Sequence, residues 1–274
     1  MSIFQAFFLG VVQGLTEFLP VSSSGHLVLF RQVFGVEAAP LLFDTMVHVG
    51  TLVAVFAVLW KDILEVLKKI WQPLTLYLII GTIPAVVAAL VFRDWLEAAF
   101  ATGNYVGFAF LGTSALLVTA ELLSKRAAVH NPRKPGEMNW LDALIVGLCQ
   151  AVAVIPGISR SGATLSGALS RGLNRDLAAR FSFMLSIPVI LGAALFQAVE
   201  LLRGGEPAAE AAAYGSIGPL AIAIGTITAA IVGFFAVRMM LKIVREKSLW
   251  GFAIYTGILG LLVLIDQFLL NLVF

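Results

Sequence analysis

The sequence has few charged residues, a single cysteine and no polar stretch long enough to form a soluble domain. Asp, Glu, Lys and Arg make up only 12% of its 274 residues, whereas 60% are hydrophobic and the mean hydropathy is +0.98. The longest polar stretch, 124–139, is too short to fold alone and is interpreted as a loop. This composition excludes a soluble globular protein and is typical of an all-α polytopic membrane protein.

The single cysteine and the lack of basic residues near the start of the chain exclude two further features. Cys149 has no partner for an internal disulfide, so we interpret it as a small packing residue. The first twenty residues are apolar, but they lack a basic segment and contain Glu17. We therefore interpret them as mature protein and not as a cleaved signal peptide.

Apolar windows of about twenty residues, the length that crosses a bilayer, recur along the chain. Two broader apolar segments, 1–35 and 140–172, are interrupted at Pro20–Gly25 and Pro156–Gly162. We expect each to form a re-entrant helix–loop–helix hairpin, because irregular backbone at membrane depth is tolerated only inside protein or beside a wet cavity. The six uninterrupted windows, predicted to be transmembrane helices, are 42–60, 74–92, 105–123, 178–202, 217–240 and 250–272.

Basic residues gather on one side of this topology. Loops 61–69, 125–134 and 238–247 together carry eleven Lys and Arg. If both hairpins enter and leave on one face, these loops share a side of the membrane, which the positive-inside rule makes cytoplasmic. Both termini are then outside, Arg31 lies on the outer side, and Arg160 is the only Lys or Arg at membrane depth.

A weak internal repeat supports the same topology. Gly14–Gly25 resembles Gly147–Gly162 in the order of its glycines, glutamate or glutamine, proline and serines. Three spans separate the copies, and an odd number requires the second copy to insert upside down. We therefore predict one integral membrane domain, 1–274, built of inverted-topology repeats at about 1–123 and 140–272 that the basic cytoplasmic loop 124–139 joins. Chance similarity between two apolar segments is the alternative.

Polar residues concentrate in the second hairpin. A charge at membrane depth costs at least a few kcal/mol, so Arg160 needs an anionic partner, with a buried ion pair as the alternative explanation. Its planar fork can hold two phosphate oxygens, and Ser159 is placed to cap a helix whose N-terminus attracts anions. The candidate phosphate ligands are Gly157, Ser159, Arg160, Ser161 and Thr164.

The first hairpin carries two polar pairs at helical spacing. Gln13 and Glu17 are four residues apart, and Ser23 and His26 are three apart, so both pairs are expected to point into one cavity. A carboxylate does not bind phosphate directly. We therefore predict that Glu17 holds a divalent cation, Mg²⁺ or Ca²⁺, or orients a proton-carrying group. His48 is expected at the cavity mouth, without a direct catalytic role.

These motifs resemble those of the bacterial undecaprenyl pyrophosphate phosphatases of the membrane-embedded, bacitracin-resistance type. The resemblance covers essentially the full length and rests on Gln13–Glu17, Ser22–His26 and Pro156–Thr164. It implies removal of the terminal phosphate of a C55 isoprenoid pyrophosphate at the outer face of the bacterial inner membrane, which recycles the lipid carrier for cell-wall synthesis. Position 13 is often glutamate in that family, which leaves direct metal ligation by Gln13 in doubt.

The resemblance also implies roles for individual residues. Glu17 and His26 are expected to be essential, with Ser23 as a nucleophile and Arg160 as the centre of the phosphate clamp. Two routes stay open: His26 takes the proton from an attacking Ser23, or His26 itself attacks or activates water. The residues expected to contact the substrate are Gln13, Ser22, Gly157, Ser159, Ser161 and Thr164.

The alternative function is a transporter or flippase of a polyprenyl phosphate, because broken helices that meet at the midplane are typical of transporters. Glu17 and His26 would then form a proton relay, and Arg160 would anchor the lipid. For either function we expect the isoprenoid lipid and bilayer lipid as partners and no nucleic acid, with a homodimer left open.

Overall fold

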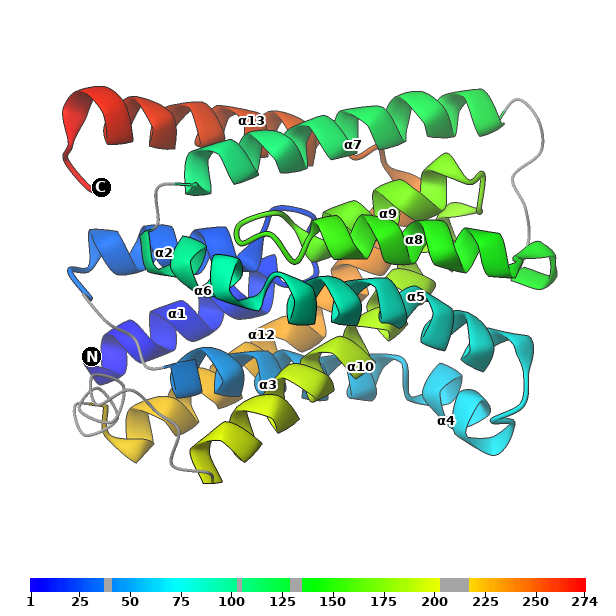
Figure 1. The fold of residues 1–274 in the computed structure, drawn as a ribbon, viewed down its shortest axis with the longest axis horizontal. Helices are drawn as coiled ribbons and strands as arrows, with labels where there is room; N and C mark the ends of the chain where they lie inside the picture. Colours follow the sequence, from blue (N-terminus) through cyan, green and yellow to red (C-terminus); the bar gives the residue numbers. More distant parts are fainter. Residues whose placement is uncertain (37–40, 103–104, 129–134, 203–216) are drawn as a thin grey trace.

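The computed structural model describes residues 1–36, 41–102, 105–128, 135–202 and 217–274 (Figure 1). Every regular element in these ranges is helical. The elements are α1 (Ile3–Thr16), α2 (Ser23–Val33), α3 (Leu41–Val58), α4 (Trp60–Lys68), α5 (Pro73–Val91), α6 (Arg93–Thr102), α7 (Val106–Ala128), η1 (Pro135–Glu137), α8 (Trp140–Val152), α9 (Arg160–Ser170), α10 (Arg175–Leu202), α12 (Pro219–Glu246), α13 (Trp250–Ile265) and η2 (Asp266–Leu270). Part of the predicted basic loop, 129–134, lies outside the described residues.

Five of the described helices, α5, α7, α10, α12 and α13, are long and apolar enough to cross a membrane. Each coincides with a window predicted from the sequence, so these windows are confirmed. The remaining window, 42–60, corresponds to α3, which is followed by α4 after a bend of 80°. The number of spans is therefore five, or six if the bent pair counts as one span.

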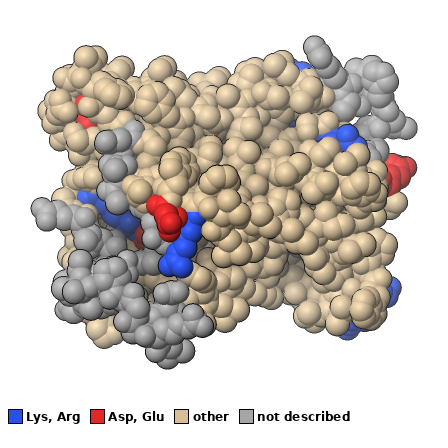
Figure 2. Space-filling model, in the orientation of Figure 1, with Lys and Arg blue, Asp and Glu red and all other residues tan. Residues whose placement is uncertain are grey.

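The spanning helices carry large hydrophobic side chains on the molecular surface. On α5, Leu76, Ile79, Ile83 and Leu90 are each more than half exposed. Figure 2 shows that uncharged side chains make up most of one face of the molecule. Apolar surface of this extent is unfavourable in water and is satisfied by lipid chains. The chain is therefore a multi-pass membrane protein.

The two interrupted segments form helix–loop–helix pairs. α1 and α2 contact each other across loop 17–22, and α8 and α9 do so across loop 153–159. Each loop contains a proline, Pro20 or Pro156, which lacks the N–H that a continuing helix needs. In Figure 1 the two pairs extend from opposite ends of the molecule, and their loops lie near its middle.

Serine side chains begin the second helix of each pair. Ser22 Oγ accepts a hydrogen bond from the Gly25 N–H at 3.2 Å, and Ser159 Oγ accepts one from the Gly162 N–H at 3.1 Å. Each bond satisfies a backbone donor that has no partner within its helix. Ser22 has a φ of 73°, in the left-handed region that residues other than glycine rarely adopt. The loop sequences therefore fix where α2 and α9 start.

Small residues let the hairpins pack closely against spanning helices. α1 packs along α12, where a Cβ atom on Gly10 would lie 2.5 Å from the carbonyl oxygen of Gly225. α8 packs along α5, where a Cβ atom on Gly147 would lie 2.7 Å from the carbonyl oxygen of Gly81. Such close backbone approach is typical of helix packing in membranes. These contacts set the positions of the two loops relative to each other.

We predict that Gly147→Ala destabilises the protein by about 1–3 kcal/mol, because the new methyl group would meet backbone atoms of α5 that cannot rotate away. The measurement is thermal unfolding in detergent. The matched control is Gly192→Ala in α10, where nothing lies within 4 Å of the added Cβ atom. The control should be neutral or stabilising, and equal effects of the two substitutions would contradict the close approach of α8 and α5.

Candidate active site

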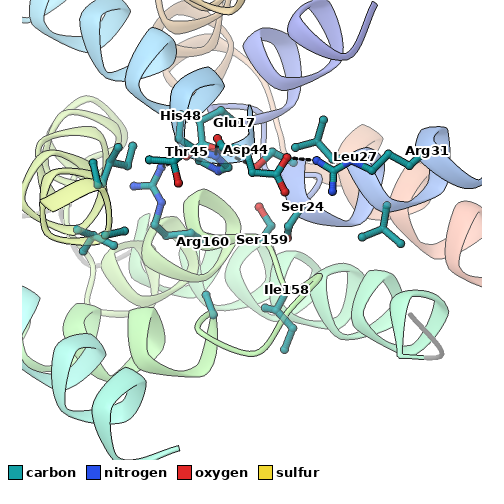
Figure 3. Close-up of a pocket in the computed structure, with 17 residues that line it drawn as sticks. Glu17, Ser24, Leu27, Arg31, Asp44, Thr45, His48, Ile158, Ser159 and Arg160 are labelled. Carbon is teal, nitrogen blue, oxygen red and sulfur yellow. Dashed lines mark hydrogen bonds and ion pairs between the residues drawn. The ribbon is translucent and has the colours of Figure 1, made fainter. Parts of the chain in front are cut away.

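A cavity of about 620 Å³ lies where the two loops meet α3 and α10 (Figure 3). Its apolar wall comes mainly from α2 and α10, including Leu27, Val28, Val189 and Ile190. Its polar lining is Glu17, Ser23, Ser24, Arg31, Asp44, Thr45, His48, Ser159 and Arg160. The cavity therefore joins charged groups from both hairpins with residues of a spanning helix.

The carboxylate of Glu17 is the centre of the polar contacts. Its Oε2 accepts hydrogen bonds from Ser23 Oγ at 2.6 Å and Gln13 Nε2 at 3.0 Å. Its Oε1 accepts one from Arg160 Nη2 at 2.6 Å. His48 Nε2 lies 3.5 Å from Oε2. These contacts bring together Gln13, Glu17, Ser23 and Arg160, four of the residues that the sequence analysis singled out as candidates.

The ion pair between Glu17 and Arg160 opposes two helix dipoles. Glu17 follows the last residue of α1, where the dipole disfavours a negative charge, and Arg160 opens α9, where the dipole disfavours a positive charge. Both side chains are largely buried, at 5% and 15% exposure. Each charge compensates the other, and Arg160 keeps a buried Nη1 atom without a partner. An anion entering the cavity would gain both that donor and the positive end of α9.

Two of the predicted phosphate ligands face protein atoms instead of the cavity. Ser161 Oγ donates to the carbonyl oxygen of Leu19 at 3.0 Å, which links the second hairpin to the first. Thr164 Oγ1 lies 2.5 Å from Ser182 Oγ and is fully buried. In this structure these hydroxyls hold α9 in place, because their side chains point toward α10 and the first loop. Of the predicted clamp, only Ser159 and Arg160 line the cavity.

Gly157 also contributes to the junction of the loops. It has a φ of 83°, and its N–H donates to Ser24 Oγ at 3.2 Å. A Cβ atom there would lie 2.7 Å from the Cβ atom of Ala109. Glycine is therefore required by both the backbone conformation and the contact with α7, while its N–H is already bound to the first hairpin.

His26 and Ser22 lie outside the cavity lining, unlike Ser23. The ring of His26 stacks on Tyr255 and meets Phe110 edge-on. Its Nδ1–H donates to the carbonyl oxygen of Ser22 at 2.7 Å, so Nε2 is the acceptor of the Tyr255 hydroxyl at 2.7 Å. Both ring nitrogens are thus bound to groups other than Ser23. The spacing of three residues predicted that Ser23 and His26 point into the same cavity. His26 instead contacts Phe110 of α7 and Tyr255 of α13.

Three further residues line the cavity: His48, which the sequence analysis expected at its mouth, and Arg31 and Asp44, to which it gave no role there. His48 donates from Nδ1 to the carbonyl oxygen of Asp44 at 2.7 Å, which turns Nε2 toward Glu17. Arg31, expected on the outer side of the membrane, lines the cavity and forms an ion pair with Asp44. Arg160 is therefore not the only basic residue there. Asp44 and His48 are four apart in an apolar helix, a spacing that could have indicated a polar stripe facing the site.

The donors near Glu17 bear on the predicted cation. Within the described ranges, no group of three or more His, Cys, Asp or Glu could hold a metal ion. Gln13 Oε1, however, is buried without a hydrogen-bond partner beside Glu17. Mg²⁺ at phosphate sites is usually bound by one or two carboxylates together with substrate oxygens and water. Glu17 lines the cavity whereas Gln13 is fully buried behind it, so a cation there would take most of its ligands from the substrate and water, and the cation stays a prediction.

The fold and the site define a multi-pass membrane protein with a charged cavity between two helix hairpins. The chain belongs to the family described as "Bacitracin resistance protein BacA", whose pattern matches residues 6–262. It is 44% identical over 267 residues to an undecaprenyl-diphosphatase of Carboxydothermus hydrogenoformans, a match that covers 97% of this chain and 98% of the relative. It is 43% identical over 268 residues to undecaprenyl-diphosphatase 4 of Bacillus thuringiensis subsp. konkukian, covering 98% of both chains. An undecaprenyl-diphosphatase of Halothermothrix orenii is 42% identical over 267 residues, covering 97% of this chain and 98% of the relative.

We predict that Glu17 and Arg160 stabilise the folded protein as a pair. Glu17→Ala or Arg160→Ala alone should each cost about 3–5 kcal/mol, because each leaves a largely buried charge without its partner. The double variant should cost much less than the sum. The measurement is a double-mutant cycle of unfolding free energies.

The control for this cycle is the exposed pair formed by Arg245 and Asp176, whose side chains are 57% and 39% exposed. Removing either partner there should change stability by less than about 1 kcal/mol from the pair itself. Additive effects at Glu17 and Arg160 would show that the two hairpins are not held together by this contact.

Proposed function

We propose that the protein is an undecaprenyl-diphosphatase, which removes the terminal phosphate of undecaprenyl pyrophosphate and returns undecaprenyl phosphate for cell-wall synthesis. The observation that carries this function is the contact of the Ser23 hydroxyl with Glu17, whose other oxygen binds Arg160. The proposed nucleophile Ser23, the proposed base Glu17 and the phosphate-binding side chain of Arg160 thus line one cavity. The names of the relatives support a phosphatase over a transporter of the same lipid.

Phosphate release from a C55 pyrophosphate by the purified protein tests this function. A phosphatase should release one phosphate per lipid, whereas a transporter should bind or move the lipid unchanged. Repeating the assay with a chelator tests the cation separately. Mg²⁺ or Ca²⁺ held by Glu17, Gln13 and substrate oxygens would neutralise charge that develops on the phosphate groups.

Ser23 is the favoured nucleophile, with Glu17 as its base. The Ser23 oxygen forms a bond to the terminal phosphorus while the bond from that phosphorus to the bridging oxygen breaks. The Ser23 proton passes to Glu17 Oε2, which lies 2.6 Å away, and from there to the departing undecaprenyl phosphate. Water then cleaves the phosphoserine, and its proton returns through Glu17 to the Ser23 oxygen. Attack by His26 is disfavoured because both of its ring nitrogens are hydrogen-bonded elsewhere.

The architecture that we propose is a pair of inverted repeats in one integral domain, at about 1–123 and 140–272, each beginning with a re-entrant hairpin. Reciprocal packing supports it: the first hairpin packs on α12, in the second half, and the second hairpin packs on α5, in the first half. The last spans of the two halves, α7 and α13, also contact each other. Gly81-Thr82-Ile83 on α5 and Gly225-Thr226-Ile227 on α12 provide matching approach points.

We place the protein in the bacterial inner membrane with the cavity open to the outside, on the strength of the positive-inside rule. In a Cys149→Ala background, Leu272→Cys should react with an impermeant thiol reagent added to intact cells, and Lys69→Cys should react only after the membrane is opened. Leu272 and Lys69 are both exposed. Labelling in the reverse order would overturn the proposed orientation.

Substitutions of Ser23 and Ser24, which lie in the same turn of α2, test which of the two hydroxyls is the nucleophile. Ser23→Ala should abolish turnover, by about 10³-fold or more, because no other hydroxyl contacts Glu17 among the described residues. Ser24→Ala, which removes a 3.2 Å bond from the Gly157 N–H and a 3.5 Å contact with Ser22 Oγ, should slow turnover several-fold. A phosphoenzyme trapped by acid quench should map to Ser23. If Ser23→Ala keeps a tenth of the activity, water or His26 is the attacking group.

A further inference from the structure

Arg31 lies in the same cavity as Arg160 but belongs to the other hairpin. It is near the end of α2, and its side chain is 15% exposed. Its Nη2 donates to Asp44 Oδ1, while its Nε is buried without any partner. In Figure 3, Arg31 and Arg160 approach the cavity from different sides, with Asp44 and Glu17 between them. The proposed phosphatase reaction leaves Arg31 without a role.

The two arginines are held in the same way. Each donates from Nη2 to one carboxylate, Arg160 to Glu17 and Arg31 to Asp44. Each also has one buried guanidinium nitrogen with no partner, Nη1 in Arg160 and Nε in Arg31. A guanidinium group can hold two oxygens of one anion. Each guanidinium group therefore still has a donor without an acceptor, and each arginine–carboxylate pair has no net charge.

The two ion pairs line one cavity, as binding of a group with two phosphates to both arginines requires. Asp44 precedes His48 by four residues of α3, a rise of about 6 Å, and His48 Nε2 lies 3.5 Å from Glu17 Oε2. His48 thus connects the two ion pairs, because its Nδ1 donates to the carbonyl oxygen of Asp44 and its Nε2 faces Glu17. Leu27 and Val28 line the cavity on the same face of α2 as Arg31. They offer an apolar wall to the first isoprene units of a lipid tail.

We propose that Arg31 binds the phosphate that remains attached to the lipid, and that this phosphate replaces Asp44 as the partner of Arg31. This assignment rests on the proposed function, because Ser23 and Arg160 then take the terminal phosphate. Arg31 and Arg160 are the two cationic side chains among the described residues that line the cavity. Arg31 would hold substrate and product alike, whereas Arg160 would hold only the group that is removed.

The test uses the purified full chain with a C15 isoprenyl diphosphate as substrate and the C15 monophosphate as product. Arg31→Gln should raise the KM of the diphosphate and the Kd of the monophosphate, each by about 10- to 100-fold, the usual effect of losing charge-assisted hydrogen bonds. Its kcat should stay within a few-fold of the wild type. Arg160→Gln should instead lower kcat strongly and leave the Kd of the monophosphate nearly unchanged.

Asp44→Asn should have the opposite effect on the affinity for the monophosphate. Removing the competing carboxylate should tighten monophosphate binding several-fold, and Arg31→Gln in the same chain should abolish that gain. Arg31→Lys keeps a charge for Asp44 but loses the fork, so it should weaken binding to an intermediate degree even if Arg31→Gln folds poorly. Arg245→Gln, in an exposed ion pair with Asp176, is the matched control and should change neither constant.

Two outcomes would overturn the assignment. If Arg31→Gln lowers the Tm but leaves the KM and the monophosphate Kd unchanged, Arg31 is only a structural partner of Asp44. If Asp44→Asn weakens monophosphate binding as Arg31→Gln does, exchange of partners is wrong. Failure of the proposed function gives a different result, namely no phosphate release by the wild type. Calorimetric binding of the monophosphate would still report on Arg31 in that case.

Discussion

The ion pair between Glu17 and Arg160 is the interaction on which the site depends. It joins the end of α1 to the start of α9, and each charge sits at the helix terminus that the dipole disfavours. Neither charge would be stable there alone, because burying an unpaired charge costs several kcal/mol. The two hairpin loops are thus held together by the same two groups to which the proposed reaction assigns the base and the phosphate ligand. A phosphate can bind the unpartnered Nη1 of Arg160, and if it also takes Nη2 from Glu17 it would free that carboxylate for its proposed role as base.

The remaining polar groups of the loops keep irregular backbone tolerable inside the protein. Ser22 and Ser159 cap the helices that follow, Ser161 binds the carbonyl oxygen of Leu19, and the Gly157 N–H binds Ser24. Backbone groups without such partners are too costly away from water. These bonds also explain why hydroxyls occur at positions that do not line the cavity, such as Ser22 and Ser161. Most of them satisfy and fix the loops, and the few that remain, Ser23 above all, are available for chemistry.

The sequence alone predicts the elements whose signals are local. Hydropathy over twenty residues locates the spanning helices, Pro20 and Pro156 mark the two breaks, and Glu17 and Arg160 stand out as charges in apolar segments. The sequence does not predict which neighbour a side chain contacts within one helical turn, because the packing of adjacent helices determines it. Thr164 turns to Ser182 and His26 to Tyr255, partners that are distant in sequence. The place of Arg31 in the cavity wall was not predicted, because a charge near the end of an apolar segment fits both a membrane surface and a cavity wall.

The pairing of the arginines in the cavity bears on how a multiply charged anion would bind there under the proposed function. Burying two unpaired arginines would cost the full desolvation free energy of both charges, whereas here Glu17 and Asp44 pair with them. A ligand then binds by exchange, and the desolvation of the arginines has already occurred during folding. An anion with one phosphate can replace the carboxylate partner of one arginine, whereas a pyrophosphate can replace the partners of both. Selectivity for the longer headgroup would thus follow from the number of paired arginines as well as from the shape of the cavity.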